Sequence, residues 1–327
     1  MARVTIGMPV YNGSGYLREA LDSILAQTFQ DFELVIGDNA STDDTEKICR
    51  EYAARDPRIR YYRHPKNLGA AANFNYVFRE CHTEYFRWAA HDDLISPNYL
   101  ERCIAALDAN PEAVIAYTKT AEIDEDGNVV EFRDPDTIGY DSPYRHVRFA
   151  ARAGRLRPPY PFLRHPHSDV EIIWGLMRSD ALRRTPLFCG HSGGDHILVA
   201  WMAALGRFAK IPEYLFFNRT HSSKFTLVYL RRRHQVSWWR LADRNAIVFP
   251  DWRLAGEFLR IIRQGPFTPW EAVYCYGAMA KYVFWNSPRM ARDLLVAARR
   301  LAGRLAGDRD KKSRPEIAPA RAAGDIS

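Results

Sequence analysis

The stretch that decides the fold is Trp88-Ala89-Ala90-His91-Asp92-Asp93-Leu94, in which an apolar run ends in two adjacent carboxylates. Its aromatic and small residues predict the end of a buried strand. Residues 95–100 follow as the start of a helix, with Ser96 as the expected N-cap and Pro97 at the first helical position. Two acids between a strand and a helix are costly to bury unless a cation lies beside them. The stretch therefore suggests a divalent metal that grips a diphosphate.

On the N-terminal side of this stretch, short apolar strands alternate with helices. Strands are expected at residues 4–11, 32–36, 59–62 and 85–89, and helices at about 16–27, from Ser41, at 70–80 and at 97–110. Such alternation predicts right-handed βαβ units, which build a parallel sheet with helices on both faces. Ligands of these sheets bind at the carboxyl ends of the strands. Asp38, the loop of residues 63–66 and the two acids at 92–93 all fall at those ends.

The second half of the chain is less regular. A strand is expected at residues 114–117, a hairpin at 122–130, a buried run at 172–177, a short helix from Ser179, a helix opening at 190–198, and a strand pair at 207–211 and 214–218. Residues 133–168 show no periodicity, which favours a long functional loop. We therefore expect an α/β domain at residues 1–224, a helical extension at 225–306 and a disordered tail at 307–327.

The composition indicates a globular protein. Of the 327 residues, 47% are hydrophobic, which is ample for a buried core. The five cysteines are far apart and form no CxxC pair, so free thiols in a reducing compartment, the cytoplasm, are expected. No leader pattern is recognisable, and no apolar run reaches the roughly 18–20 residues of a membrane helix. A soluble or peripheral protein is expected.

The net charge limits the classes of molecule that we expect as partners. The net charge is +7 and the sequence pI is about 9.1, which suits polyanions. Nucleic acid is not expected, because no homeodomain, zinc-finger, RRM or KH signature accompanies the charge. A nucleotide or an anionic lipid surface remains.

Five motifs, in this order and spacing, resemble those of the family 2 glycosyltransferases of the GT-A fold. They are residues 5–12 (TIGMPVYN), 37–43 (GDNASTD), 67–69 (NLG), 91–93 (HDD) and 194–195 (GD). The resemblance covers about residues 3–224 and implies a mainly parallel α/β sheet. It also implies transfer of a sugar, with inversion, from a nucleotide-diphosphate sugar linked to UDP, dTDP or GDP. The acceptor would be a hydroxyl of a glycan or a lipid-linked glycan.

The resemblance assigns the nucleotide pocket to the turn after the first strand and to the end of the second. Pro9, Tyr11 and Asn12 would form the turn, where Tyr11 stacks on the base. Asp38 would accept hydrogen bonds from the base or the ribose. Arg63 and Lys66 would form a basic loop beside the base and the diphosphate.

The resemblance also assigns the metal and the catalytic base. Asp93 would bind Mg2+ or Mn2+, with Asp92 as its partner or as a ribose contact, and His221 would complete the metal or diphosphate site. Because no acid precedes Asp92, the diphosphate and water would supply most of the other metal ligands. Asp195 would be the base that takes the proton from the attacking hydroxyl.

Alternatives remain open at this point. The two acids at 92–93 and Asp195 are also residues that begin helices well. A nucleotidyltransferase uses a metal and a nucleotide at the same sheet edge, and a glycan- or lipid-binding scaffold would need no catalysis. The amphipathic residues 290–305, with Leu294, Leu295 and Leu301 opposite arginines, would either pack on the domain or lie on an anionic membrane.

Overall fold

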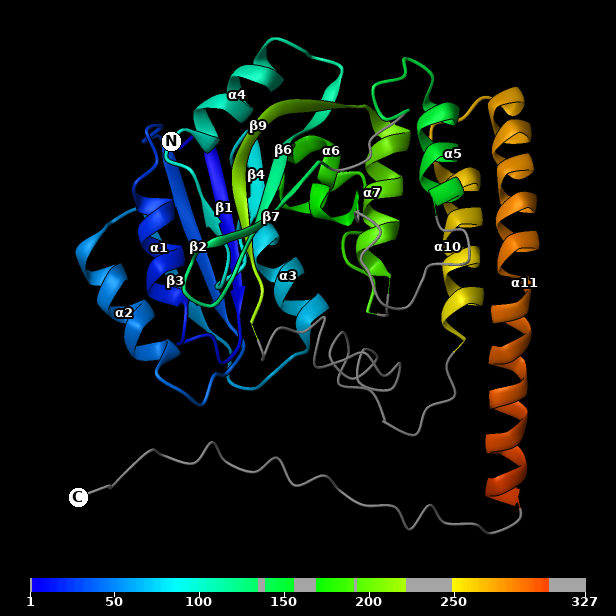
Figure 1. Ribbon diagram of the computed structural model, residues 1–327, viewed down its shortest axis with the longest axis horizontal. Coiled ribbons are helices and arrows are strands. Elements are labelled where there is room, and N and C mark those ends of the chain that lie inside the picture. Colours follow the sequence, from blue (N-terminus) through cyan, green and yellow to red (C-terminus); the bar gives the residue numbers. More distant parts are fainter. Residues whose placement is uncertain (1, 135–138, 156–168, 191–192, 222–248, 306–327) are drawn as a thin grey trace.

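The structure is a computed structural model that describes residues 2–134, 139–155, 169–190, 193–221 and 249–305. Within these residues, nine strands form one sheet (Figure 1). The strands are β1 (Val4–Val10), β2 (Phe32–Asp38), β3 (Ile59–Arg63), β4 (Tyr85–Trp88), β5 (Leu94–Ile95), β6 (Ala113–Ile123), β7 (Val129–Arg133), β8 (Leu176–Arg178) and β9 (Arg207–Arg219).

The sheet has the order β3-β2-β1-β4-β8-β6-β9-β5, and β7 pairs with β6. β3, β2, β1 and β4 are parallel neighbours, as the βαβ pattern predicts. β8 runs antiparallel to both β4 and β6, whereas β6 and β9 are parallel. The two reversals at β8 cancel, so β1, β2 and β9 all end at the same edge of the sheet.

Helices cover both faces of the sheet. The helices of the described residues are α1 (Leu17–Leu25), α2 (Thr45–Arg55), α3 (Ala70–Arg79), α4 (Tyr99–Asp108), α5 (Arg145–Arg155), α6 (Ser179–Arg183), α7 (Gly194–Leu205), α10 (Pro250–Gln264) and α11 (Pro269–Leu305), with a 3-10 helix at Asp169–Trp174. α1, α2 and α4 share one apolar core with the sheet, and α3, α6 and α7 share a second core on the other face. The predicted α/β class, with a helical C-terminal extension, is confirmed.

A third core joins the extension to the α/β part. It contains Phe149 of α5, Trp201 of α7, Phe258 of α10 and Tyr282 of α11. α7 is buried on both sides, because it lies between the sheet and the other helices. This position explains why the helix is apolar all round.

The loop predicted at residues 133–168 is wrong in part, because α5 lies inside it. Its buried residues include Arg148 and Arg152, which hide the apolar period of a packed helix. Arg148 donates hydrogen bonds to the carbonyl oxygens of Ala203 and Ser142, both at 2.7 Å. Burial lowers the pKa of Arg148 to about 10.

Smaller predictions also differ from the structure. The expected strand pair at 207–218 is one strand, β9, in which Ile211 pairs with Thr118 and Tyr214 with Lys119. Pro212 lacks an N–H for the ladder, so the two intervening residues form a bulge. Helices α2 and α4 begin at Thr45 and Tyr99, later than the predicted caps Ser41 and Ser96. The predicted tail at 307–327 lies outside the described residues.

The exposure of apolar residues on α11 differs from one alternative for residues 290–305, that their apolar stripe packs on the domain. The apolar residues Leu294, Leu295 and Leu301 are exposed, whereas Met290 and Ala297 are buried. The predicted apolar stripe of residues 290–305 is therefore not the side of α11 that packs on the protein. No helix in the described part of the chain is both long and apolar enough to cross a membrane.

Candidate active site

The loops that follow β1 and β2, at residues 11–13 and 41–42, form a polar surface that we call the shelf. Asn12, at φ 51°, accepts a hydrogen bond from the N–H of Thr42 at Oδ1, at 2.8 Å, and its own N–H donates to Ser41 Oγ at 3.0 Å. Gly13 donates from its N–H to Thr45 Oγ1 at 2.9 Å. These bonds hold the loop after β1 against the start of α2. Tyr11, at the rim, is 45% exposed, which leaves its ring open to a ligand.

Asp38 is fully buried beneath this shelf. Its Oδ1 accepts the N–H of Ser41 at 2.8 Å, and its Oδ2 accepts the Tyr61 hydroxyl at 2.7 Å. Burial, and then the bond to Asp38, raise the pKa of Tyr61, so this hydroxyl stays a donor. Asp38 thus organises the loop, and its predicted contact with a base or ribose stays a prediction.

Of the two cations in the predicted basic loop, Arg63 forms ion pairs within the protein and Lys66 is exposed. Arg63 lies beside Asp38 in the sheet register, with Nε 3.6 Å from Asp38 Oδ2 and 2.8 Å from Glu46 Oε2. Pro9 is a buried residue of β1 and supports the turn from below. Arg63 is therefore the positioned cation of this loop.

Gly37 permits a close packing that fixes the shelf. Asn73 of α3 donates from Nδ2 to the carbonyl oxygen of Gly37 at 2.7 Å, and its Oδ1 lies 3.0 Å from His64 Nε2. A Cβ on Gly37 would lie 2.5 Å from Asn73 Oδ1. Only glycine fits there, so α3 can approach the strand end.

Asp92 and Asp93 face different surroundings. Asp93 is buried, and its Oδ1 accepts the N–H of Arg219 at 2.9 Å while its Oδ2 accepts Asn218 Nδ2 at 3.2 Å. The carboxylate of Asp92 lies 2.9 Å from Nε2 of His221. The binding of metal to Asp93 stays a prediction, and these contacts favour Asp92 for that role, since Asp93 ties the loop to β9.

Arg219 is a site residue that the sequence did not reveal. It is fully buried and donates to the carbonyl oxygens of Asp92 at 3.1 Å and Glu125 at 2.9 Å, and to Glu19 Oε2 at 2.6 Å. Its guanidinium lies over the ring of Tyr16, which also packs on His221. Three segments, namely the loop after β4, the turn between β6 and β7, and the start of α1, meet at this one side chain. A lone arginine at the end of a strand carries no sequence signal of such a role.

Asp195 lies in the first turn of α7, after Gly193 at φ 87°. Its Oδ1 accepts the N–H of His196 at 2.8 Å. α7 leads directly into the start of β9, so the first turn of α7 lies toward the edge where β9 ends (Figure 1). The fold thus brings Asp195 to the same end of the molecule as the shelf and the Asp92–His221 pair.

The side chains at this edge of the sheet include possible ligands for a metal ion. In the described ranges, no group of three or more His, Cys, Asp or Glu side chains is gathered as a complete metal site. Asp92 and His221 do offer one carboxylate oxygen and one imidazole nitrogen at a single point. This set fits an ion whose remaining ligands come from a diphosphate and water.

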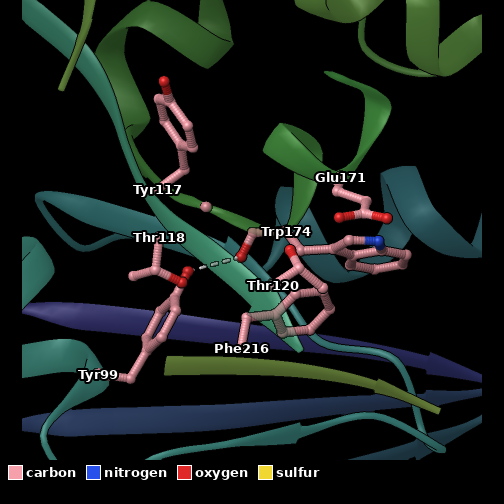
Figure 2. A pocket seen from close by; sticks show the side chains of 8 residues that line it. Tyr99, Tyr117, Thr118, Thr120, Glu171, Trp174 and Phe216 are labelled. Atoms are coloured by element: carbon pink, nitrogen blue, oxygen red, sulfur yellow. Dashed lines mark hydrogen bonds between the residues drawn. The ribbon is translucent and has the colours of Figure 1, made fainter. Parts of the chain in front are cut away.

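A small cavity lies beside β6 and β9 (Figure 2). Among its lining residues, Tyr99 donates from its hydroxyl to the carbonyl oxygen of Trp174 at 3.0 Å, and Thr118, Thr120 and Phe216 lie around them. The cavity has room for the centre of about one water molecule, near 10 Å³. It is too small for a sugar ring.

Comparison with known proteins supports the resemblance to a glycosyltransferase family. The family model described as "Glycosyl transferase family 2" matches residues 5–163. The resemblance to the family 2 glycosyltransferases is confirmed over those residues, which are just under half of the chain. An uncharacterized glycosyltransferase of Rickettsia felis is 37% identical over 139 residues, which are 41% of this chain and 22% of that protein. Chondroitin synthase of Escherichia coli is 35% identical over 127 residues, or 39% of this chain and 18% of the enzyme.

Solved structures share the fold of this chain. TarS of S. aureus in complex with UDP-GlcNAc has a TM-score of 0.59 at 16% identity, and the match covers 88% of this chain and 72% of TarS. The mannosyltransferase PcManGT from Pyrobaculum calidifontis, in complex with GDP-Man and Mn2+, has a TM-score of 0.55 at 19% identity, covering 94% and 79%. The predicted GT-A fold is confirmed. The chain spans about a fifth of the length of the two curated relatives named above.

Proposed function

We propose that this protein is an inverting glycosyltransferase that moves a sugar from a nucleotide-diphosphate sugar to a hydroxyl of a glycan or glycolipid. The observation that carries the proposal is the Asp92–His221 pair, 2.9 Å apart, at the sheet edge where the shelf after β1 and β2 also ends. An acid and an imidazole beside an open nucleotide shelf suit the binding of a diphosphate with a cation. Donors linked to UDP, dTDP or GDP are the candidates.

In this proposal the shelf binds the nucleoside. The exposed ring of Tyr11 stacks on the base, and the loop at Asn12 is already fixed by its bonds to Ser41 and Thr42, so little ordering is needed on binding. Arg63 and Lys66 add positive charge beside the diphosphate.

Asp92 and His221 would hold Mg2+ or Mn2+ together with the diphosphate. The ion would neutralise the charge that develops on the leaving group. Arg219 keeps this pair in place, because it binds the backbone oxygen of Asp92 and packs with Tyr16 under His221.

Asp195 would act as the general base. The acceptor oxygen attacks the anomeric carbon on the face opposite the diphosphate, the bond from that carbon to the phosphate oxygen breaks, and the proton moves to the Asp195 carboxylate. The products are the inverted glycoside and the nucleoside diphosphate. The position of Asp195 at the start of α7, with one oxygen held by the N–H of His196, supports this role.

A lipid-linked acceptor would place the protein at the cytoplasmic side of a membrane. This part of the proposal is supported by the basic net charge of +7. In this proposal the protein is bound to the membrane surface as a peripheral protein.

The proposal is tested by incubating the full chain with UDP-, dTDP- and GDP-sugars in the presence of Mn2+ or Mg2+. One donor class is expected to raise the melting temperature only with the metal, and slow hydrolysis or transfer should release nucleoside diphosphate. In a parallel incubation with a nucleoside triphosphate and a sugar 1-phosphate, release of pyrophosphate would instead indicate a nucleotidyltransferase. No metal-dependent binding of any nucleotide would support a scaffold and refute the proposal.

A further inference from the structure

α11 presents apolar side chains on two opposite sides. The side that packs on α5 and α10 is a buried stripe of Cys275, Met279, Tyr282, Asn286, Met290, Asp293 and Ala297. On the other side Trp270 is 84% exposed, Phe284 71% and Leu295 60%. At 3.6 residues per turn these three lie near one line, roughly opposite the buried stripe. Packing on the protein explains one side only, so the outer side needs another partner.

Cationic side chains border this outer apolar line. Lys281, Arg292 and Arg299 are exposed and follow one another at intervals of 11 and 7 residues, which places them in a second line about 50° from the first. Among the described side chains of α11, the acids are Glu271 and Asp293. Asp293 is buried, and Glu271 is mostly buried beside His146 and Arg145. The exposed charge of the described helix is therefore positive.

We propose that the outer face of α11, defined by Trp270, Phe284, Leu295, Lys281, Arg292 and Arg299, lies on an anionic phospholipid bilayer. The apolar side chains would enter the headgroup region, and the long cationic side chains would reach the lipid phosphates. Each cation near such a surface adds to the attraction.

The charge pattern favours lipid over a second copy of the chain. Two copies packed through this face would bring rows of like charge together, with no exposed carboxylate on the described part of α11 to offset them. A bilayer supplies the missing negative charge.

The geometry of the helix allows this contact without rearrangement. α11 is about 55 Å long at 1.5 Å per residue, and it lies at the outer edge of the molecule, on the far side from α1 and α2 (Figure 1). It continues beyond α10, whose start is level with Asp293 through the bond from the Asp251 N–H. The inference does not depend on the proposed transfer reaction.

The test is cosedimentation of the full chain with vesicles of phosphatidylcholine, with or without phosphatidylglycerol. Binding is expected only to the vesicles that contain phosphatidylglycerol and should weaken as salt is added. The variant Lys281→Glu/Arg292→Glu/Arg299→Glu should bind about tenfold less or weaker still. The variant Phe284→Ser/Leu295→Ser should also lose binding, since it removes the apolar anchors.

The matched control is Lys47→Glu/Arg79→Glu/Arg184→Glu, which makes the same charge change at exposed sites outside α10 and α11. It should bind as the unmodified protein does, and circular dichroism should show all variants folded. Equal loss in the control and the α11 variant would overturn the proposal, as would absence of binding to anionic vesicles. A dimer in sedimentation equilibrium that Phe284→Ser/Leu295→Ser dissociates, without vesicle binding, would assign the face to a second copy.

Discussion

At the scale of single residues, Asp92 and Asp93 differ through contacts that come from far along the chain. Asp93 is held by the backbone of Arg219, and Asp92 lies beside His221. Adjacent residues at a strand end point in different directions, so one of the pair can serve the fold and the other a ligand. The sequence predicted the acidic corner but could not divide the roles, because the partners in β9 and just after it are more than 120 residues away.

Asp92→Asn is expected to remove the effect of Mn2+ on nucleoside diphosphate binding, because the amide is a much weaker ligand for a hard cation. Its melting temperature should change little, since the amide oxygen can keep a hydrogen bond to His221. Asp93→Asn should instead lower the free energy of unfolding by about 1–3 kcal/mol, as charge-assisted bonds in a buried place become neutral ones. Calorimetric binding and urea unfolding of both variants check this. Loss of the Mn2+ effect in Asp93→Asn but not in Asp92→Asn would instead assign the metal to Asp93.

Asp195→Asn is expected to reduce turnover by about a hundredfold or more and to leave nucleotide binding nearly intact, because the amide keeps the shape but cannot take the proton. Asp180→Asn is the matched control. Asp180 also lies in the first turn of a helix and accepts the next N–H at 2.8 Å, as Asp195 does. Steady-state kinetics with a donor and acceptor found by screening would measure both. Similar rates for the two variants would exclude Asp195 as the base.

At the scale of elements, the end of β9 is fastened to several loops by Arg219. This side chain binds the loop after β4 through Asp92, the β6–β7 turn through Glu125, and α1 through Glu19. Such a buried cation with backbone acceptors is hard to replace, because each acceptor left without a donor has lost its water as well.

Arg219→Leu should lower the free energy of unfolding by about 3 kcal/mol, since buried carbonyl groups lose their donor. Arg18→Leu provides the contrast. Arg18 has the same 2.6 Å contact with a glutamate, Glu51, but its side chain is 47% exposed, and the loss should be much smaller because water screens the pair. Urea denaturation of both variants gives the comparison. Equal losses would show that the buried contacts of Arg219 contribute no more to stability than an exposed ion pair does.

The sequence predicted elements well where one face of the element meets an apolar core. α1 shows Leu17, Leu21 and Ile24 on one stripe, and the parallel strands are continuous apolar runs. It failed where buried positions are polar, as at Arg148 and Arg152 of α5. It also missed β5, because two residues beside β9 carry no period of their own. The site edge could be predicted because strand ends are visible, but its tertiary partners could not.

At the scale of the whole molecule, the thiols buried in the cores make the free energy of unfolding depend on pH. Burial raises the pKa of Cys49, Cys103 and Cys275 to about 12 each, against 9.0 for an ordinary thiol. From about pH 9 upward the unfolded chain loses thiol protons that the folded chain keeps, so stability falls as pH rises through this window. The urea midpoint should drop between about pH 8 and pH 10, and the drop should be smaller in Cys49→Ala/Cys103→Ala/Cys275→Ala. An identical drop in the variant would contradict this cause.

The third core makes the helical extension part of one cooperative unit. α7 packs on the sheet through Leu198 and Met202 and on α10 and α11 through Ile197 and Trp201. Opening the extension would expose the outer side of α7 to water. Unfolding of α10 and α11 is therefore coupled to the sheet that carries the candidate site.

Phe258→Ala should destabilise the whole chain by about 3–5 kcal/mol, since this fully buried ring packs against Phe149 and Tyr282. Phe284→Ala, on the exposed side of α11, should change stability by less than about 0.5 kcal/mol. Urea unfolding followed by tryptophan fluorescence and by far-ultraviolet circular dichroism should give one coincident transition in both variants. If Phe258→Ala instead split the curve, with an early step that left nucleotide binding unchanged, the extension would be an independent unit attached to the α/β domain. A single shifted transition requires that the strength of the α10 and α11 packing sets the stability of the sheet edge itself.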